Sequence, residues 1–556
     1  FFKQKTAYEM LRSLVGSEMC IRDSCSIEQK NLIRLYFSPR IRTFYNTIYQ
    51  RKNTGEYMSN IIGNYVGGST VKLNGGAHQD VFNPSTGEVS GQVLLSTTKD
   101  LDEVVEVAKA ALPEWSRTPV GMRAQVMFRF KRLLEENADR IARTISSEHG
   151  KTHEDALGEV TRGLEAVDFA CGIPHLMKGT FSEQVSSSID MYSIPQALGV
   201  VAGITPFNFP AMVPMWMFPN AIACGNTFIL KPSERDPSVS LIIADLFKQA
   251  GLPDGVFNVI QGDKVVVDAI LDHPDIAAVS FVGSTPVAKY IYSRGASNGK
   301  RVQALGGAKN HMVIMPDANM DQVVDALMGA GYGSAGERCM AVAVPVPVGK
   351  QVADNLMDRM VPLVEELPVG PPDDSKAAMG PIITKQSLER ITSLLQSGVD
   401  QGAALLVDGR GLTVPGHEKG FFIGGSLFDQ VQPEMDIYKE EIFGPVLSTV
   451  RADDYEDAIN LIHGNPHGNG VAIFTRDGDA ARDFASRIEV GMVGINVPIP
   501  VPVGYHSFGG WKQSLFGTHH IYGPETIHFY TRLKAITSRW PAGIKSGAQY
   551  NFPTMN

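Results

Sequence analysis

The spacing of apolar residues predicts a mainly helical segment after a short lead-in of strands. The stretches NYVGG and VFNPSTGEV combine apolar residues with turn residues, which is typical of short strands. Between residues 100 and 175 apolar residues recur every three or four positions, as in LDEVVEVAKAAL and RAQVMFRFKRLLEENADRIARTI. That is the period of an amphipathic helix, so we expect helices throughout this segment.

From Leu198 onward, short apolar runs alternate with helical stretches. The runs LGVVAGI, NTFIL, GVFNVI, AAVSFVG and KRVQAL are separated by helical segments such as 236–250 and 264–272. This alternation indicates βαβ units with a buried parallel sheet, the outline of a nucleotide-binding fold, although the GxGxxG fingerprint is absent. A second α/β segment runs from about residue 310 to 497. The pattern therefore predicts an α/β fold.

Composition narrows the classes of protein to which the chain can belong. Its 556 residues, 43% of them apolar, are enough for two or three domains. The formal net charge of −9 and the lack of a basic stripe argue against nucleic-acid binding. No apolar run reaches the ~18–20 residues of a membrane span, so no membrane partner is expected. Five cysteines form no disulfide framework, and without CxxC, HExxH or a tight His/Cys cluster no metal site is expected.

The first 57 residues differ in composition from the rest. From Gln29 to Asn53 there are six basic residues and no acidic one, with apolar residues and Ser/Thr between them. This composition predicts a mitochondrial transit peptide and a matrix location. If the segment is instead a disordered basic tail, the protein is expected in the cytoplasm. Residues 1–24 match neither a presequence nor the domain that follows, and they resemble translated adaptor sequence.

Cys339, in the stretch GSAGERCMA at residues 333–341, is the first candidate for chemistry. A free cysteine is most often a small buried hydrophobe. Here, however, the surrounding residues are small, which lets a substrate approach the backbone, and Arg338 adds a positive charge that favours the thiolate. On its own this stretch is compatible with a buried hydrophobe and with a nucleophile.

Four further stretches carry polar residues beside predicted strands or turns. In GITPFNFPAMVPMWMFPNAIACGN, Asn208 is either a structural Asx cap or a donor to an oxyanion. In ILKPSERDP, Lys231 and Glu234 come just after a strand, where α/β sheets bind ligands. In SFVGSTPVA, Ser284 suits a helix N-cap and a phosphate contact, and both roles can hold together. The last stretch is KEEIFGPV, residues 439–446.

Taken together in this order, the motifs resemble those of the NAD(P)-dependent aldehyde dehydrogenase superfamily over about residues 60 to 540. TPFNFP, KPSER, GERCMA, KNHMVIMPDAN and NVPIPVP resemble its CoA-acylating semialdehyde dehydrogenase branch. The resemblance implies a Rossmann-like NAD-binding domain, an α/β catalytic domain and a small oligomerisation hairpin, in a homodimer or homotetramer. The expected divisions are a leader over 1–57, an NAD-binding domain over 58–308 with the hairpin at about 180–197, a catalytic domain over 309–497, and a C-terminal segment over 498–556 with a strand near 526–537.

Residue roles follow from the same resemblance. Cys339 corresponds to the nucleophile, and Asn208 with the Cys339 backbone N–H corresponds to the oxyanion hole. Phe443 would lie near the nicotinamide. The positions that correspond to NAD contacts are Thr205, Phe207, Lys231, Glu234, Arg235, Ser284, Gly306 and Glu441. A thiolate adding to an aldehyde gives an alkoxide, which such a hole stabilises by about 3–4 kcal/mol, and hydride then passes to NAD.

One departure separates the branches of the superfamily. Hydrolytic members carry a water-activating glutamate in an ELGGK segment, whereas this chain reads RVQALGGAKN at 301–310, which puts Leu305 at that place. Without that base water is a poor nucleophile, whereas coenzyme A brings its own thiol. The absence could also be sequence drift at a strand end, but the CoA-acylating branch shares it, so the resemblance implies CoA as co-substrate. The alternatives are a hydrolytic NAD-dependent semialdehyde dehydrogenase and a non-catalytic binding or structural protein, although the presence of both Cys339 and Asn208 argues against the latter.

Two arginines complete the resemblance. Arg162 in GEVTRG and Arg338 in GERC correspond to positions that bind a substrate carboxylate, for which guanidinium forks are suited. From the residues alone, Arg162 would be a solvated helix residue. The resemblance implies oxidation of methylmalonate or malonate semialdehyde to propionyl-CoA or acetyl-CoA with release of CO2, in valine and pyrimidine (thymine) catabolism.

Overall fold

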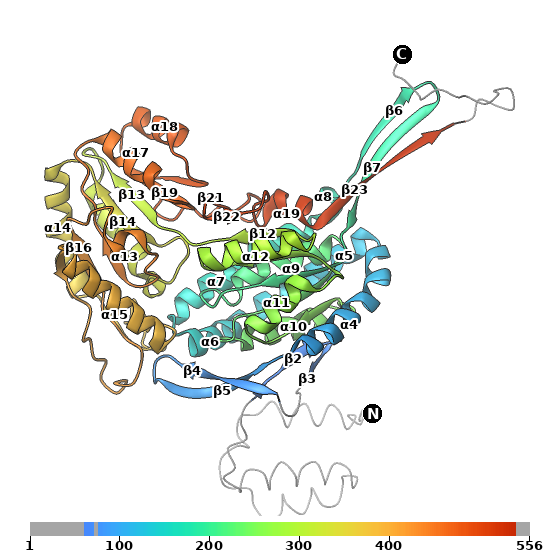
Figure 1. Ribbon diagram of the computed structural model, residues 1–556, viewed down its shortest axis with the longest axis horizontal. Coiled ribbons are helices and arrows are strands. Elements are labelled where there is room, and N and C mark those ends of the chain that lie inside the picture. Colours follow the sequence, from blue (N-terminus) through green and yellow to red (C-terminus); the bar gives the residue numbers. More distant parts are fainter. Residues whose placement is uncertain (1–60, 72–75, 541–556) are drawn as a thin grey trace, which may run out of the picture. The chain divides into compact units, whose positions relative to one another are not determined.

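The computed structural model describes residues 61–71 and 76–540 (Figure 1). The predicted leader over residues 1–57 and the chain after Trp540 lie outside the described residues. Within the described part, no helix is both long and apolar enough to cross a bilayer. The same residues contain no group of three or more His, Cys, Asp or Glu side chains suited to holding a metal ion.

An eight-stranded sheet in the order β22-β12-β11-β8-β9-β10-β2-β3 forms the first half of the fold. Its five central strands are parallel, as the alternation of apolar runs and helices predicts. They are β8 (Val200–Ile204), β9 (Thr227–Lys231), β10 (Phe257–Val259), β11 (Ile276–Val282) and β12 (Arg301–Leu305). The antiparallel edges are β22 (Leu515–Phe516), β2 (Asn64–Val66) and β3 (Ser69–Val71). The predicted α/β fold is confirmed.

Helices cover both faces of this sheet, and one apolar core lies on each side. On one face α5 (Val120–Glu136), α6 (Ala138–His149), α7 (His153–Cys171), α9 (Met212–Ala223) and α10 (Ser238–Gln249) pack against residues such as Val201 and Phe228. On the other face α4 (Thr98–Arg117), α11 (Lys264–Asp272) and α12 (Thr285–Ser297) pack against Val200 and Ile229. Consecutive strand residues thus serve opposite faces, as the pleat of a β-strand requires. The predicted helices between 100 and 175 are confirmed.

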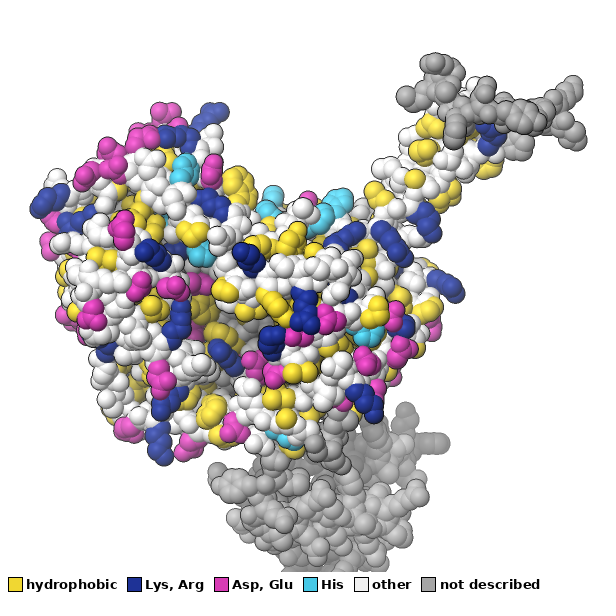
Figure 2. All heavy atoms as spheres, viewed as in Figure 1, with side chains coloured by type: hydrophobic (Ala, Val, Ile, Leu, Met, Phe, Trp, Pro, Cys, Tyr) yellow, Lys and Arg dark blue, Asp and Glu magenta, His cyan; other side chains and the backbone are white. Residues whose placement is uncertain are grey.

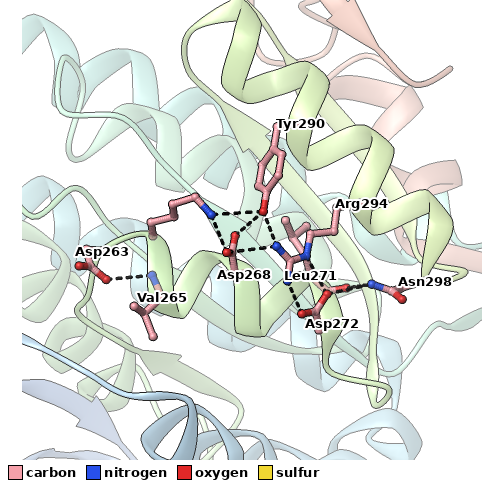
Figure 3. A network of polar contacts seen from close by, with 9 residues as sticks. Asp263, Val265, Asp268, Leu271, Asp272, Tyr290, Arg294 and Asn298 are labelled. Atoms are coloured by element: carbon pink, nitrogen blue, oxygen red, sulfur yellow. Dashed lines mark hydrogen bonds and ion pairs between the residues drawn. The ribbon is translucent and has the colours of Figure 1, made fainter.

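Side chains on α11 and α12 are joined by a polar network at the surface of the second face (Figure 3). Arg294 binds Asp272 and lies against the hydroxyl of Tyr290, which itself donates to Asp268 at 2.8 Å. Lys264 bridges Asp268 and Tyr290. The network therefore links α11 to the helix that begins at the end of β11.

A second parallel sheet, in the order β14-β13-β19-β20, builds the other half of the fold. Its strands are β13 (Asn310–Ile314), β14 (Val342–Pro347), β19 (Gly470–Phe474) and β20 (Met492–Ile495). It shares a core with α13 (Met320–Tyr332), α14 (Lys350–Glu365), α15 (Lys385–Asp400), α17 (Tyr455–Gly464) and α18 (Gly478–Arg487). Met340 and Met492, however, pack into the core of the first half. The two cores meet there, and the domain boundaries stay predictions.

Smaller elements complete the described chain. One two-stranded sheet pairs β18 (His467–Gly468) with β21 (Trp511–Lys512). One three-stranded sheet consists of β1 (Ile61–Ile62), β4 (Ala77–Asn83) and β5 (Glu88–Leu95). Another consists of β15 (Ala404–Val407), β16 (Ser426–Asp429) and β17 (Val446–Ser448). The short helices are α8 (Ile173–Leu176), η2 (Gly333–Gly336), α16 (Asp436–Lys439) and α19 (Gly523–Tyr530).

One three-stranded antiparallel sheet projects from the first half (Figure 1). It consists of β6 (Thr180–Ser186), β7 (Ile189–Ala197) and β23 (Thr531–Arg539), with β7 in the middle. The sequence places a hairpin at about 180–197 and a strand near 526–537, but residues 526–530 are helical, because α19 continues to Tyr530 and the strand begins only at Thr531.

Candidate functional site

The predicted polar residues gather at the carboxyl edge of the eight-stranded sheet. Thr205 follows β8, Lys231 ends β9, Ser284 follows β11 and Gly306 follows β12. The chain runs from β8 through β9 to β10 on one side, and β11 then lies beside β8 on the other side. Ligands bind open α/β sheets at such a reversal, outside the carboxyl ends of the strands.

Lys231 and Glu234 form a partly buried ion pair at this edge. Lys231 Nζ lies 2.9 Å from Glu234 Oε2, and the exposed fractions of the two side chains are 6% and 29%. Burial acts to raise the pKa of Glu234, but the charge and hydrogen bond of Lys231 outweigh it and leave that pKa lowered. The pair therefore presents a carboxylate beside the end of β9.

Phe207, Arg235 and Phe443 come together from three segments. The Arg235 guanidinium lies 4.7 Å from the centre of the Phe207 ring, and that ring meets Phe443 edge-on at 5.7 Å. Phe443 has a φ of 55°, a left-handed conformation that costs a non-glycine residue strain. The three side chains form a wall on which a flat ring can pack, with Arg235 over the face of Phe207 and Phe443 edge-on to it.

Ser284 occupies the N-cap position of α12, but its hydroxyl forms no capping hydrogen bond. The residue is exposed. Thr285 Oγ1, one residue on, accepts a hydrogen bond from Gly307 N at 2.9 Å. The start of α12 is therefore tied to the loop after β12 and leaves the Ser284 hydroxyl at a helix N-terminus, where anions are favoured.

Glu441 lies against the loop after β12. It accepts a hydrogen bond from Ala308 N at 3.0 Å, and a Cβ on Gly307 would come within 2.4 Å of its Oε2. Burial raises the pKa of Glu441 to about 7. Gly306 also allows a close approach, since a Cβ there would be 2.6 Å from the carbonyl oxygen of Gln513.

Cys339 lies on a tight loop between α13 and β14 and is half-buried. Ser334, Ala335 and Gly336 adopt φ values of 51°, 51° and 71° in succession. The carbonyl oxygen of Cys339 accepts hydrogen bonds from Asn310 Nδ2 at 3.0 Å and Asn469 Nδ2 at 3.2 Å. A strained turn, tied down by two amides, thus holds the thiol in place.

Burial and two charged side chains set the pKa of the Cys339 thiol. Burial raises the pKa of Cys339 to about 12, the carboxyl of Glu441 raises it further, and Arg338 lowers it only in part. The Arg338 guanidinium forms an ion pair with Asp155, with 2.6 Å between Nη2 and Oδ1. Arg338 thus acts in the expected direction, towards the thiolate, but burial and Glu441 outweigh it and leave the pKa of the thiol raised.

Asn208 is 3% exposed, and its side chain lies against the cysteine loop. Nδ2 donates to the carbonyl oxygen of Glu337 at 2.8 Å, two residues before Cys339. The residue is not a cap, because α9 begins at Met212 with Ala211 as its N-cap. An asparagine amide carries two donors, so one N–H is left for another acceptor.

Lys151 and Glu159 position the backbone around Asn208, and neither residue was expected from the sequence. Lys151 Nζ donates to the carbonyl oxygen of Asn208 at 2.6 Å and to Glu159 Oε2 at 2.7 Å. Glu159 Oε1 accepts from the backbone N–H groups of Ala211 and Met212 at 2.7 and 3.1 Å. Both charged side chains are fully buried. The available signal was the position of Glu159, which falls on the apolar face of α7.

Arg162 extends from α7 to a loop near the C-terminus. Nη1 binds Glu165 Oε1 at 2.7 Å, and Nη2 donates to the carbonyl oxygen of Pro502 at 2.8 Å. The hydroxyl of Tyr522 donates to the same carbonyl, and Arg162 and Cys339 both influence the pKa of Tyr522, which burial raises. Arg162 and Cys339 thus both act on Tyr522, but Arg162 does not line the pocket beside the thiol, and its guanidinium has a carboxylate partner.

The position that corresponds to the water-activating glutamate is Ala304, and the expectation of Leu305 was wrong by one residue. In ELGGK the glutamate stands two positions before the first glycine, which in this chain is Ala304 rather than Leu305. Ala304 and Leu305 are 0% and 2% exposed within β12, and neither offers a base. The carboxyl group that influences Cys339 is that of Glu441.

A pocket opens beside the thiol, and the loops described above line it. Its walls include Asn310, Arg338, Cys339, Glu441 and Phe443. A nucleophile, a carboxyl group and an aromatic ring therefore border one space. Asn208 reaches the same cysteine loop through Glu337. This arrangement suits addition of a thiol to a carbonyl group whose oxygen is stabilised by an amide.

Comparison with sequence families gives one match over most of the chain. Residues 71–536 match the model described as "Aldehyde dehydrogenase family". Among curated proteins, malonate-semialdehyde dehydrogenase of Pseudomonas aeruginosa is 59% identical over 491 residues, which cover 88% of this chain and 99% of that protein. Mitochondrial methylmalonate-semialdehyde dehydrogenase [acylating] of Arabidopsis thaliana is 48% identical over 500 residues, 90% of this chain and 82% of that protein.

Solved structures give a similar result. A Sinorhizobium meliloti protein, assigned as a methylmalonate-semialdehyde dehydrogenase and complexed with NAD, superposes with a TM-score of 0.87 at 59% identity, covering 88% of this chain and 100% of that chain. Methylmalonate-semialdehyde dehydrogenase of Oceanimonas doudoroffii gives 0.86 at 56% identity, covering 87% and 99%.

Proposed function

The chain belongs to the aldehyde dehydrogenase family, and from that premise we propose that it oxidises malonate-type semialdehydes with NAD and passes the acyl group to coenzyme A. The observation that carries the proposal is Cys339 on its strained loop, with Asn208 bound to the same loop through Glu337. The names of the relatives at 59% and 48% identity support the substrate class.

NAD fits the carboxyl edge of the eight-stranded sheet. The Ser284 hydroxyl forms no capping hydrogen bond, so it and the N-terminus of α12 can bind a phosphate. The Lys231–Glu234 pair suits a ribose hydroxyl. Thr205 and Gly306 follow β8 and β12 at the same edge, Glu441 lines the pocket beside Cys339, and the wall of Phe207, Arg235 and Phe443 suits a flat ring. When bound, NAD supplies the acceptor for the hydride that leaves the substrate carbon.

The protein's own groups account for the first covalent step. The thiol of Cys339 first loses its proton to solvent. Its sulfur then attacks the aldehyde carbon, and a C–S bond forms while the C=O π bond opens to an alkoxide. The free N–H of Asn208 and the backbone N–H of Cys339 hold that charge, which is worth about 3–4 kcal/mol. Once hydride has left, a thioester on Cys339 remains.

Coenzyme A completes the turnover in this proposal. Its thiolate attacks the thioester carbon, the Cys339 sulfur leaves and takes up a proton, and a CoA thioester is released. For a malonate-type acyl group the bond between the carboxylate and the α-carbon breaks before release, CO2 leaves and the α-carbon takes up a proton, which gives acetyl-CoA or propionyl-CoA. Ala304 offers no base for water, which supports CoA as the acceptor.

Arg162 and Arg338 are the proposed ligands of the substrate carboxylate. Each guanidinium is partly exposed and paired with one carboxylate, Glu165 or Asp155, so a substrate would share or replace that partner. Replacing either by Ala should lower kcat/KM for malonate semialdehyde by roughly 10–150-fold, the value of a charge-assisted hydrogen bond, and change propanal turnover much less. Equal losses on both substrates would show that Arg162 holds structure, and that Arg338 acts on the structure or on the thiol, whose pKa it lowers.

Assembly and location form the remaining part of the proposal. The projecting sheet exposes 66% of Phe181 and 73% of Leu533, which suits an interface in a homodimer or homotetramer. A mitochondrial location rests on the basic leader and on the mitochondrial Arabidopsis relative. More similar relatives are bacterial, and without a functional leader we expect the protein in the cytoplasm.

A rapid-mixing experiment tests the proposed function. With malonate semialdehyde and NAD but no CoA, we expect one burst of NADH per site and an acyl group on Cys339 by mass spectrometry. Turnover should then stall, because general-base help is worth about 100–10,000-fold, and should resume when CoA is added. Cys339→Ala, the control, should bind NAD and give no burst. Steady NADH formation without CoA would favour the hydrolytic alternative, with Glu441 as the candidate base.

A further inference from the structure

A second cavity, of about 440 Å³, lies where the projecting sheet joins the body of the protein. It forms between the end of α4, the start of α5, the last residues of β7 and the start of β23. Figure 2 shows Lys and Arg side chains gathered near this junction. The cavity shares no lining residue with the pocket beside Cys339. Its volume falls in the range of small-molecule sites.

Three arginines and no acidic residue line this cavity. They are Arg117 from α4, Arg123 from α5 and Arg532 from β23. Among the described residues, none of the three forms an ion pair with a carboxylate, although the whole chain carries a net charge of −9. The thiol of Cys224, also in the lining, stays neutral because burial raises its pKa to about 12. The cavity is therefore strongly positive.

Arg123 is the one buried arginine of the three. It is 5% exposed, and its Nε has no hydrogen-bond partner in the described part of the chain. Its other contacts are weak: Nη1 lies 3.5 Å from the carbonyl oxygen of Ser116, and Nη2 lies 3.7 Å from the sulfur of Met177. Gly225 packs so closely on the guanidinium that a Cβ there would be 2.4 Å from Nη1. A buried charge without a partner is costly, and this one borders a cavity.

We propose that this cavity binds a small multivalent anion of the phosphate or polycarboxylate class. Arg123 binds it at the floor through its guanidinium fork, and the exposed side chains of Arg117 and Arg532 close over it from two elements. Guanidinium groups bind both anion classes through paired N–H donors. Because the arginines come from α4, α5 and β23, the bound anion joins the helices to the root of the projecting sheet.

Thermal unfolding of the full chain tests this site with inorganic phosphate as the probe. Saturating NAD is present throughout, so that phosphate does not report on the cofactor site. We expect a saturable rise in Tm with phosphate that sodium chloride at equal ionic strength does not reproduce. A parallel titration with citrate shows whether polycarboxylates share the site. Failure here would leave the proposed dehydrogenase activity untouched, since that activity does not use these residues.

Rim variants make the test specific. Arg117→Gln and Arg532→Gln should each weaken the apparent phosphate affinity about tenfold or more. Arg132→Gln is the matched control, because this exposed arginine on α5 lies outside the cavity and pairs with Glu136. Arg123→Met should abolish the saturable phosphate shift, and if this variant fails to fold, the rim variants still decide. The proposal is overturned if phosphate gives no saturable shift, or if both rim variants respond as the wild type does.

Discussion

At the scale of single residues, Glu441 and Arg338 act on the Cys339 thiol in opposite directions. Glu441 adds to the effect of burial, which raises the thiol pKa to about 12, and Arg338 opposes it. The pKa of Glu441 itself is about 7, so its negative charge develops as the pH rises through neutrality. Deprotonation of the thiol is therefore most strongly opposed above pH 7, where Glu441 is ionised.

Alkylation of Cys339 by iodoacetamide measures this balance. Glu441→Gln removes the negative charge and should speed alkylation, with a difference from wild type that grows as the pH rises above 7. Arg338→Met removes the opposing charge and should slow it. Labelling is followed by mass spectrometry of the Cys339 peptide, and the Cys171 peptide serves as the internal control, since burial also raises the pKa of that thiol to about 12. An unchanged rate in Glu441→Gln would contradict this account.

The buried Lys151–Glu159 pair gives a second prediction at this scale. Lys151→Met frees the carbonyl oxygen of Asn208 and leaves the buried Glu159 carboxylate without a counter-charge, so we expect a loss of stability of about 3–5 kcal/mol. Below the unfolding temperature, the NADH burst rate should fall by up to the ~100–1,000-fold that one oxyanion donor is worth, with NAD affinity kept.

A double-mutant cycle separates positioning from general damage. If Lys151 acts through Asn208, then adding Lys151→Met to Asn208→Ala should slow the burst little further. Fully multiplicative losses would mean that Lys151 contributes by another route. Lys131→Met, which breaks an exposed ion pair with Asp168, is the matched control for loss of a lysine.

At the scale of elements, the network between α11 and α12 is a contrast to that buried pair. Its charged groups lie at the surface, where ion pairs are screened and contribute little. Arg294→Ala should lower Tm only slightly, and the difference should shrink at high salt. Tm of both proteins at low and high ionic strength checks this. A loss as large as that of Lys151→Met would show that the network anchors α12.

Local sequence pattern determines some elements of this fold, and tertiary packing determines others. Helices α4, α5 and α6 follow from apolar periodicity, but not all of their ends do: Pro113 lies inside α4, and Asn137, between α5 and α6, gives α6 no side-chain cap. The start of β23 does not follow from the sequence either, because residues 526–530 suit a helix or a strand, and packing of α19 against α9 selects the helix. Periodicity over five residues does not separate these two states.

At the scale of the whole molecule, the projecting sheet is the surface whose role is simplest to test. Leu533→Asp places a charge on an exposed apolar strand and should lower the molar mass measured by light scattering, if this sheet forms the interface. Leu412→Asp is the control, since Leu412 is 40% exposed but lies in a loop outside the sheet. An unchanged mass in Leu533→Asp would remove the sheet from the interface.

The sequence by itself determined the α/β fold, the parallel strands and the family, because these depend on short-range patterns and on motifs such as TPFNFP and GERC. The tertiary structure alone decided the partners of the charged groups. Asp155 takes up Arg338 from 183 positions away, Lys151 binds the carbonyl of Asn208, and Arg532 joins Arg117 and Arg123 around one cavity. Such contacts join residues distant along the chain, and only the packing of helices and sheets brings them within bonding distance.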